Sequence, residues 1–486
     1  MRKSGLIAAL LLAGCTVGPN YHRPAAIVPT HYKTLAGWVI ATPEAAITRG
    51  AWWSIFDDRT LDALESQVNV SNQTIRADVA AYAQARALVD EARAGFYPTL
   101  SANGGVTRES GGSSRGSGGS GGGLSGQSFT ETSYTLEGSG AWDIDLWGRV
   151  RREVQSSVAA AQVSAADLAN AELSEQAALA SDYFQLRAAD ADQTLLQATI
   201  AAYRRSLQIT ENQFAAGTTA RSDVLTAEVQ LQNAESAAIG ARVARAEFEH
   251  AIAVLIGKPP ADLTIPSGPL QAAVPVVPPG VPSTLLERRP DIASAERTMA
   301  EENALIGVQV AAYYPAIDLT ALFGYVGTPL GSLITLSNRV WSLGAAATDP
   351  LFEGGARSAA VAAARAGYDE SVANYRGTVL AAFQGVEDNL SSLRILAEQY
   401  QAQAAAVASA REAVAITLNE YEAGTVAFTA VVVAQATQLA DEQTLLTIQQ
   451  NRLLASVGLI ENLGGGWRAA DLPTPAELQT SNPLLP

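Results

Sequence analysis

The sequence contains one cysteine, three histidines and few basic residues among its 486 positions. A single thiol excludes an internal disulfide, and the scattered His22, His31 and His250 lack the spacing typical of a metal or catalytic site. Lysine and arginine number 32 against 48 acidic residues, which gives a formal net charge of −16. Nucleic acid is disfavoured as a partner, because its phosphates would be repelled. We expect no catalytic residues, no metal site and no cofactor.

Proline and long apolar runs are missing from most of the chain. No proline occurs between Pro98 and Pro259 or between Pro350 and Pro473, so long helices can form in both windows. The apolar run at 5–13 is too short to span a bilayer as a helix. No other run of 18 uncharged apolar residues follows it, and we therefore expect no helical membrane span in the mature chain.

The N-terminus is typical of a bacterial lipoprotein signal. A short basic region precedes the apolar run, and Leu12-Ala-Gly-Cys15 ends it. This pattern predicts cleavage behind Gly14 and acylation of Cys15, for example with palmitate. The alternative is an incidental cysteine in a cleaved leader. Thr16 follows instead of an aspartate, which resembles the signal for outer-membrane sorting.

An internal duplication organises the rest of the chain. The turns Gly217-Thr-Thr-Ala and Gly424-Thr-Val-Ala lie between long helical patterns, and Ile256-Gly257 and Leu463-Gly464 follow them at the same spacing. Apolar residues on both sides step by four and three, as in a left-handed coiled coil. The helix expected between 148 and 216 would be about 100 Å long. These patterns predict one elongated body built from two similar halves.

Two segments change from helical to alternating periodicity. In the first, Tyr134, Leu136 and Trp142 share one face with small residues, while the other face is polar. The second alternates in the same way from Ile317 to Tyr325, and 341–347 forms its partner. Each half therefore supplies one hairpin. Such strands suit a transmembrane β-barrel, and a soluble hairpin with a one-sided core is the alternative.

The predicted organisation divides the chain into six segments. They are a signal peptide at 1–14, an extended arm at 15–60, a first repeat at 61–257 with a hairpin at 99–147, a proline-rich linker at 258–290, a second repeat at 291–464 with a hairpin at 316–352, and a tail at 465–486. The first repeat is expected to open with one helix from Leu61 to Leu88. We also expect His250 to pack in the coiled-coil seam.

Several long motifs occur in a fixed order. They are Val17-Gly-Pro-Asn-Tyr21, Trp52-Trp53-x-x-Phe56-x-Asp58, Trp142-Asp-Ile-Asp-Leu146-Trp-Gly148, Arg288-Arg-Pro-Asp-Ile292-x-x-Ala-Glu296 and the paired tip motifs. Together with the lipoprotein signal they resemble the NodT/OprM branch of the TolC-type outer-membrane efflux factors. The resemblance covers essentially the whole chain.

The resemblance implies a mostly α fold with a transmembrane β-barrel part. The chain would form a homotrimer in which each protomer gives four strands to a twelve-stranded barrel, and twelve helices would form a periplasmic tunnel, or α-barrel. It would be lipid-anchored in the cell outer membrane, meet a periplasmic adaptor and an inner-membrane pump of the RND type, and passively conduct drugs or other small molecules. Oligomerisation also follows independently, because four strands alone cannot close a barrel with a lumen.

The same resemblance implies roles for residues at the tips. The exposed docking tips for the adaptor are Ala216, Gly217, Thr218, Ala423, Gly424 and Thr425; they could instead be helix stops only. The pore gate residues are Arg221, Asp223, Tyr421, Val426, Phe428 and Val433. We expect one acidic ring from Asp223 and an apolar constriction after the second tip. The alternative is a solvated pair of Arg221 and Asp223 near the helix start.

Other functions stay open on the sequence alone. Type I protein secretion and metal-ion efflux belong to the same channel class. A lipid-anchored periplasmic coiled-coil scaffold would explain the helices and Cys15, but not the alternating strands. A lipoprotein hydrolase would need a nucleophile, a histidine and an acid, and the sequence shows no such set.

Overall fold

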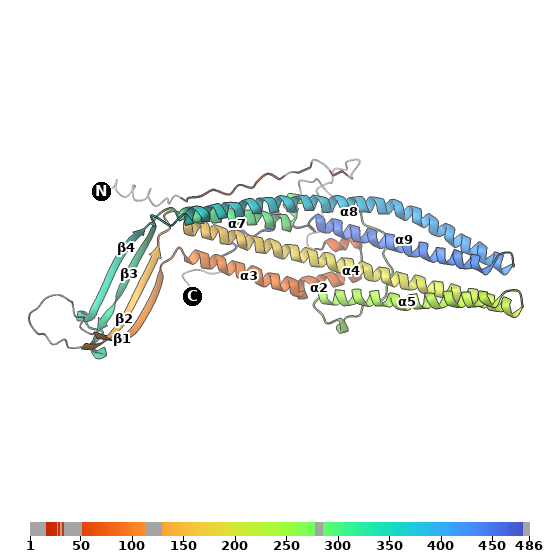
Figure 1. The fold of residues 1–486 in the computed structure, drawn as a ribbon, viewed down its shortest axis with the longest axis horizontal. Coiled ribbons are helices and arrows are strands. Elements are labelled where there is room, and N and C mark those ends of the chain that lie inside the picture. The colour runs from red at the N-terminus through yellow and green to blue at the C-terminus, as the bar shows by residue number, and fades with distance from the viewer. Residues whose placement is uncertain are drawn as a thin grey trace, which may run out of the picture.

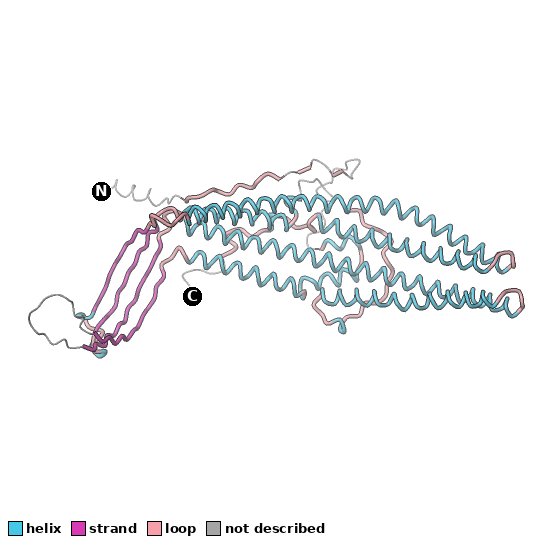
Figure 2. The backbone as a smooth tube through the Cα atoms, viewed as in Figure 1, coloured by secondary structure: helices cyan, strands magenta, loops and turns pink. Residues whose placement is uncertain are grey.

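The computed structural model describes residues 16–26, 28–29, 32–33, 51–111, 129–277 and 285–479. The described part of the chain is elongated, with a sheet at one end and two helical tips at the other (Figure 1). Strands are confined to the sheet end, and helices form most of the remaining length (Figure 2).

The helices repeat between the two halves. In the first half they are α2 (Arg59–Ser71), α3 (Gln73–Ala94), α4 (Arg149–Ala215) and α5 (Arg221–Leu255), and in the second α6 (Leu285–Arg288), α7 (Pro290–Ala311), α8 (Ala356–Glu422) and α9 (Phe428–Asn462). Helices α4 and α8 both have 67 residues, and α5 and α9 both have 35. The duplication read from the sequence therefore extends to the lengths of the helices. At about 1.5 Å per residue, α4 and α8 are each about 100 Å long.

One antiparallel sheet contains strands from both halves. Its strands are β1 (Thr99–Gly111), β2 (Phe129–Asp143), β3 (Ala316–Gly327) and β4 (Arg339–Thr348), in the order β1-β2-β3-β4. Trp142 pairs with Leu319 across the two halves. Large apolar side chains are exposed on the strands, Leu100 at 83% and Leu343 at 76%. Within the described chain, β1 and β4 each leave one edge unpaired.

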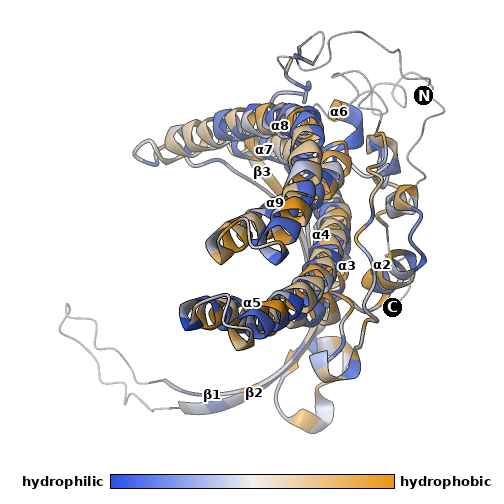
Figure 3. Ribbon diagram, turned by 90° about the vertical axis from the view of Figure 1, so that its right-hand side faces the viewer, coloured by the Kyte–Doolittle hydropathy of each residue, from blue (hydrophilic) through white to orange (hydrophobic). Residues whose placement is uncertain are grey.

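The long helices lie in a curved row. Figure 3 shows α8, α9, α4 and α5 following one another along an arc, with α2 on its convex side. A core cluster in the middle of the molecule joins both halves; in it Phe56 lies 4.8 Å from Phe184, measured between ring centroids. Buried alanines such as Ala161 and Ala180 let the helices approach closely. In the part of the chain that the structure describes, no helix has the length and hydropathy needed to cross a membrane.

The first helix of the chain differs from the sequence prediction. The single helix expected from Leu61 to Leu88 is wrong, because the helix breaks at Asn72. The side chain of Asn72 accepts a hydrogen bond from Ile75 N, which caps α3, and donates one to Leu255 O at 2.9 Å. An asparagine cap satisfies the free N–H groups of a new helix start. The expected burial of His250 is also wrong, since this residue is exposed.

The described start of the N-terminal arm is laid along the helices. Arg152 donates hydrogen bonds to Val17 O at 3.1 Å and Gly18 O at 3.2 Å. A Cβ added at Gly18 would lie 2.5 Å from Gly307 Cα, so only glycine permits this approach. The contacts fix the chain just after position 15 near the junction between the sheet and the helices. Cys15 itself lies outside the described residues.

Helix α2 carries a buried carboxyl group with no hydrogen-bond partner. Glu65 is 0% exposed, and neither of its carboxyl oxygens has a partner in the structure. Burial, and secondarily the nearby Asp62 carboxylate, raise the pKa of Glu65 from 4.5 to about 9. The folded protein therefore keeps this proton at neutral pH, whereas the unfolded chain releases it.

Replacing this group with its neutral isostere should stabilise the protein at alkaline pH. Because the folded pKa is raised, the wild type loses stability as the pH rises from about 4.5 to about 9. We expect Glu65→Gln to leave stability near pH 4.5 unchanged and to increase it at pH 8 by roughly 1–3 kcal/mol. Thermal unfolding at both pH values, with the exposed Glu211→Gln as control, measures the difference. An equal gain at both pH values would contradict the assignment.

Candidate functional site

The two helical tips have the same local structure. Helix α4 ends at Ala215, Gly217 adopts a φ of +75°, and Gly424 adopts +74° in the second tip. Nothing lies within 4 Å of a Cβ added at either glycine, so the backbone angle and not crowding requires glycine. This positive φ is the left-handed conformation that commonly ends helices.

The tip threonines close the turns on themselves. Thr218 Oγ1 donates a hydrogen bond to Gln213 O at 2.9 Å, and Thr425 Oγ1 donates to Glu420 O at 2.8 Å. The backbone N–H groups of both threonines donate to the same carbonyl oxygens, each at 2.9 Å. Ala216–Thr218 and Ala423–Thr425 are exposed. Each turn is therefore held by its own threonine, while all three of its residues stay exposed.

The two charged residues predicted for the gate start helix α5. Asp223 lies in its first turn and accepts a hydrogen bond from Thr219 Oγ1 at 2.5 Å. Arg221 is exposed, and within the described residues no ion pair joins it to Asp223. An acid in the first helical turn suits the helix dipole. The structure thus separates the two charges, with the carboxylate tied to its own turn.

Two of the predicted gate residues are buried inside the protomer. Tyr421 is 4% exposed and Phe428 is 1% exposed, and their rings lie 5.2 Å apart. They pack with Val431 and with Ala227 of the other hairpin. The prediction that Phe428 lines an apolar constriction is therefore wrong for this conformation, because its side chain faces a core. Tyr421 likewise acts as a packing residue here.

The two valines of the predicted constriction have different surroundings. Val426 is partly buried against the cluster of Tyr421 and Phe428. Val433 is 65% exposed and stands on the free surface of α9. Of the three apolar residues expected to form the constriction, Val433 is the one with a largely exposed side chain.

Polar contacts between the two hairpins were missed by the sequence reasoning. Gln435 Nε2 donates to Ser206 Oγ at 2.8 Å in a buried position. Gln213 Nε2 donates to Tyr421 O at 3.2 Å, and Gln230 Nε2 to Val432 O at 3.3 Å. One feature of the sequence could have indicated these contacts: Gln435 lies within an otherwise apolar stretch of α9. These bonds and the buried cluster hold the two hairpins together just behind the tips.

The arrangement offers contact surfaces and packing, and no chemical centre is visible in it. Among the residues that the structure places, no group of three or more His, Cys, Asp and Glu side chains could hold a metal ion. Its main features are the two exposed turns, the Asp223 carboxylate that is hydrogen-bonded to Thr219, and the buried contact between the two long hairpins at Tyr421 and Phe428.

Comparison with known proteins identifies the family. The family model described as outer membrane efflux protein matches residues 64–258 and 281–465, which is most of the chain. The chain belongs to this family. The outer membrane efflux protein is thus the outer-membrane component of an efflux system, and it extends into the periplasm.

Relatives and solved structures cover nearly the whole chain. The antibiotic efflux pump outer membrane protein ArpC of Pseudomonas putida is 28% identical over 471 residues, which are 95% of this chain and 94% of ArpC. The cation efflux system protein CusC of an Escherichia coli O6:H1 strain is 28% identical over 470 residues, 95% and 97% of the two chains. The structure of the outer-membrane channel OprN superimposes with a TM-score of 0.86 at 28% identity, covering 93% of this chain and 100% of OprN.

Proposed function

We propose that this outer membrane efflux protein works as a homotrimer whose protomers complete one barrel and one tunnel. The edges of β1 and β4 are unpaired within the described chain, and in lipid such edges need partners. The exposed apolar side chains on the strands suit contact with lipid. The curved row of long helices gives each protomer the shape of a tunnel segment (Figure 3). Three copies would supply twelve strands and the periplasmic α-barrel.

The tunnel passively conducts small molecules that a periplasmic adaptor and an inner-membrane pump, of the RND type, deliver to the tips. One observation carries this proposal: a single chain joins a sheet with exposed apolar residues to helical hairpins about 100 Å long. The conducted substrates are drugs or other small molecules in this proposal, as for the relative named for antibiotic efflux. The pump partner sets the substrate, as relatives named for antibiotics and for cations suggest.

A susceptibility measurement tests the proposed function. The gene is deleted in its own host and restored from a plasmid, and susceptibility to a panel of drugs, solvents, copper and silver is measured. We expect deletion to raise drug susceptibility and the plasmid to restore resistance. Changes restricted to metals would replace drug efflux with cation efflux. No change with any compound, together with gel migration that heating does not alter, would favour a periplasmic scaffold.

The Ala216–Thr218 and Ala423–Thr425 turns form the adaptor docking tips in this proposal, and Asp223 and Val433 face the lumen near the gate. Exposure of both turns supports the first assignment. The second rests on the position of both side chains just behind the tips and on the exposure of Val433. A single acidic ring from Asp223 should bind blocking cations less strongly than two rings would.

Cys15 is the proposed acylation site. The acyl chain and the proposed barrel would be two separate attachments to the membrane. One acyl chain alone gives only marginal membrane binding. Replacing the leader with a cleavable secretory one and introducing Cys15→Ser should abolish labelling with palmitate. Most of the protein should stay in the outer-membrane fraction. Recovery of the variant as a soluble monomer would argue against the barrel.

A further inference from the structure

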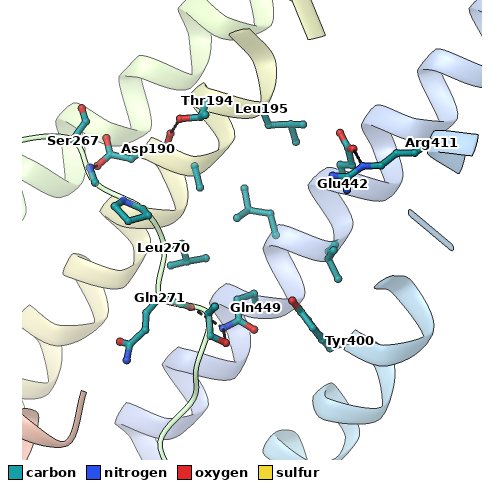
Figure 4. A pocket seen from close by; sticks show the side chains of 16 residues that line it. Asp190, Thr194, Leu195, Ser267, Leu270, Gln271, Tyr400, Arg411, Glu442 and Gln449 are labelled. Atoms are coloured by element: carbon teal, nitrogen blue, oxygen red, sulfur yellow. Dashed lines mark hydrogen bonds and ion pairs between the residues drawn. The ribbon is translucent and has the colours of Figure 1, made fainter. Parts of the chain in front are cut away.

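A hollow away from the tips lies where the linker after α5 crosses the long helices (Figure 4). Its volume of about 590 Å³ falls within the range of small-molecule sites. The large apolar side chains of its lining are four leucines and one tyrosine. They are Leu195 of α4, Leu270 of the linker, Tyr400 of α8 and Leu445 and Leu446 of α9. Both halves of the chain therefore contribute to one apolar surface.

Hydrogen bonds hold the linker wall of this hollow in place. Gln449 Nε2 donates to the backbone oxygens of Gln271 at 2.8 Å and Ala272 at 3.0 Å. Asp190 Oδ2 accepts from Gly268 N at 3.1 Å. The Asp190 carboxylate also pairs with the guanidinium of Arg245, which is 2.7 Å away. The wall is thus preformed, and its one carboxylate is already neutralised by protein groups.

The opposite side carries an exposed arginine that pairs with a buried glutamate. Arg411 Nε lies 2.6 Å from Glu442 Oε1, and the Arg411 side chain is 64% exposed. Within the described chain this pair uses only the Nε–H of the guanidinium, so its terminal N–H groups can donate to a ligand. Arg452 lies over the Tyr400 ring at 4.8 Å and donates to Gln449 Oε1 at 2.8 Å. Arg452 does not line the hollow, so Arg411 is the cationic side chain that a ligand in it would meet.

We propose that this hollow binds an amphipathic organic anion. An apolar body about the size of a fused ring system packs against the leucines and Tyr400, and its carboxylate or sulfonate accepts hydrogen bonds from Arg411. The guanidinium of Arg411 would repel a cationic ligand, and a neutral ligand would leave its terminal N–H groups without a charged acceptor. Gln271 Nε2 in the linker wall donates a hydrogen bond at 2.8 Å to the backbone oxygen of Phe56, which lies three residues before α2. Helix α2 lies on the convex side of the helical row (Figure 3). The site is therefore separate from the proposed conducting path.

Binding here would connect the two halves of the protomer. Leu195 belongs to the first half, Leu270 to the linker and Leu446 to the second half, so one ligand contacts both halves. A ligand shifts an equilibrium between conformations only by its difference in affinity for them. A bound anion therefore favours the relative position of α4 and α9 that is seen in this structure.

Equilibrium binding of a matched pair of fluorescent probes tests the proposal. The full-length protein is placed in lipid nanodiscs, and empty nanodiscs provide the background. Dansylglycine carries an apolar ring system and a carboxylate, whereas dansylamide carries the same rings without the charge. We expect saturable binding of dansylglycine, one per protomer, with an affinity about tenfold above that for dansylamide.

Two substitutions locate the probe. Arg411→Gln should lower dansylglycine affinity about tenfold and remove the preference over dansylamide. Arg394→Gln, on the same helix and paired only with Glu398 among the described residues, is the matched control and should change nothing. Leu195→Trp should fill the hollow and abolish binding of both probes. Binding no stronger than in empty nanodiscs, or equal affinities in wild type and Arg411→Gln, would overturn the proposal.

Discussion

A strain whose channel carries Ala216→Asp and Ala423→Asp should become as drug-susceptible as a strain that lacks the channel. Both alanines are exposed at the proposed docking tips, and each caps its helix through its backbone N–H, which a substitution leaves in place. Six new carboxylates per proposed trimer would oppose close approach of an apolar or acidic adaptor surface. The minimal inhibitory concentrations of pump substrates measure the loss. Trimer yield after detergent extraction should equal that of the wild type.

A matched pair of substitutions separates docking from the role of helix stop. Thr218→Val and Thr425→Val remove the side-chain hydrogen bonds to Gln213 O and Glu420 O without adding charge. The backbone bonds to the same oxygens stay, so we expect nearly normal resistance. If the valine variant loses resistance and the aspartate variant keeps it, the tips act only as turns. Normal resistance in both variants would also reject the docking role.

Local periodicity explains which features the sequence could predict. The steps of four and three around Gly217 and Gly424 depend on neighbouring residues alone, so the long helices and both tips were readable. The alternation around Leu136 and Phe323 likewise indicated strands that the structure contains. The pairing of β2 with β3 joins the two halves and is carried by backbone groups. No side-chain pattern indicated it.

Features that depend on tertiary packing could not be read in the same way. Asn72 breaks a periodic helix because its side chain reaches Leu255 O on another helix. Phe428 is buried because Ala227 of the other hairpin is small enough to receive it. A resemblance to a family supplied the gate region, but it could not tell which side chains there face a core and which face solvent. That distinction required the relative position of the two hairpins.

Truncation of Phe428 should open the channel at rest. Its ring fills the joint between the hairpins, and Phe→Ala changes in protein cores cost about 3–5 kcal/mol. Its loss weakens the attachment of α9 to α5 just behind the tip, while the hydrogen bond from Gln435 to Ser206 still joins the hairpins at the next level. We expect Phe428→Ala to raise basal conductance several-fold in planar-bilayer recordings. Ile416→Ala, at a 50% exposed position on α8 outside the proposed gate, should leave it near the wild-type value.

Substitutions that change the charge just behind the tips should alter block by cations more than they alter basal conductance. Asp223→Ala removes the one proposed acidic ring and should relax block by multivalent cations, whereas Val433→Asp adds a second ring and should strengthen it. In Asp223→Ala the hydrogen bond from Thr219 is also lost, so a modest rise in basal conductance is expected. The buried contact of Phe428 and the proposed acidic ring can therefore be told apart. Phe428→Ala should change basal conductance without changing cation block, and Val433→Asp should change cation block without changing basal conductance. If Phe428→Ala conducts like the wild type while both charge variants change basal conductance strongly, the resting closure depends on the acidic ring and not on the buried joint.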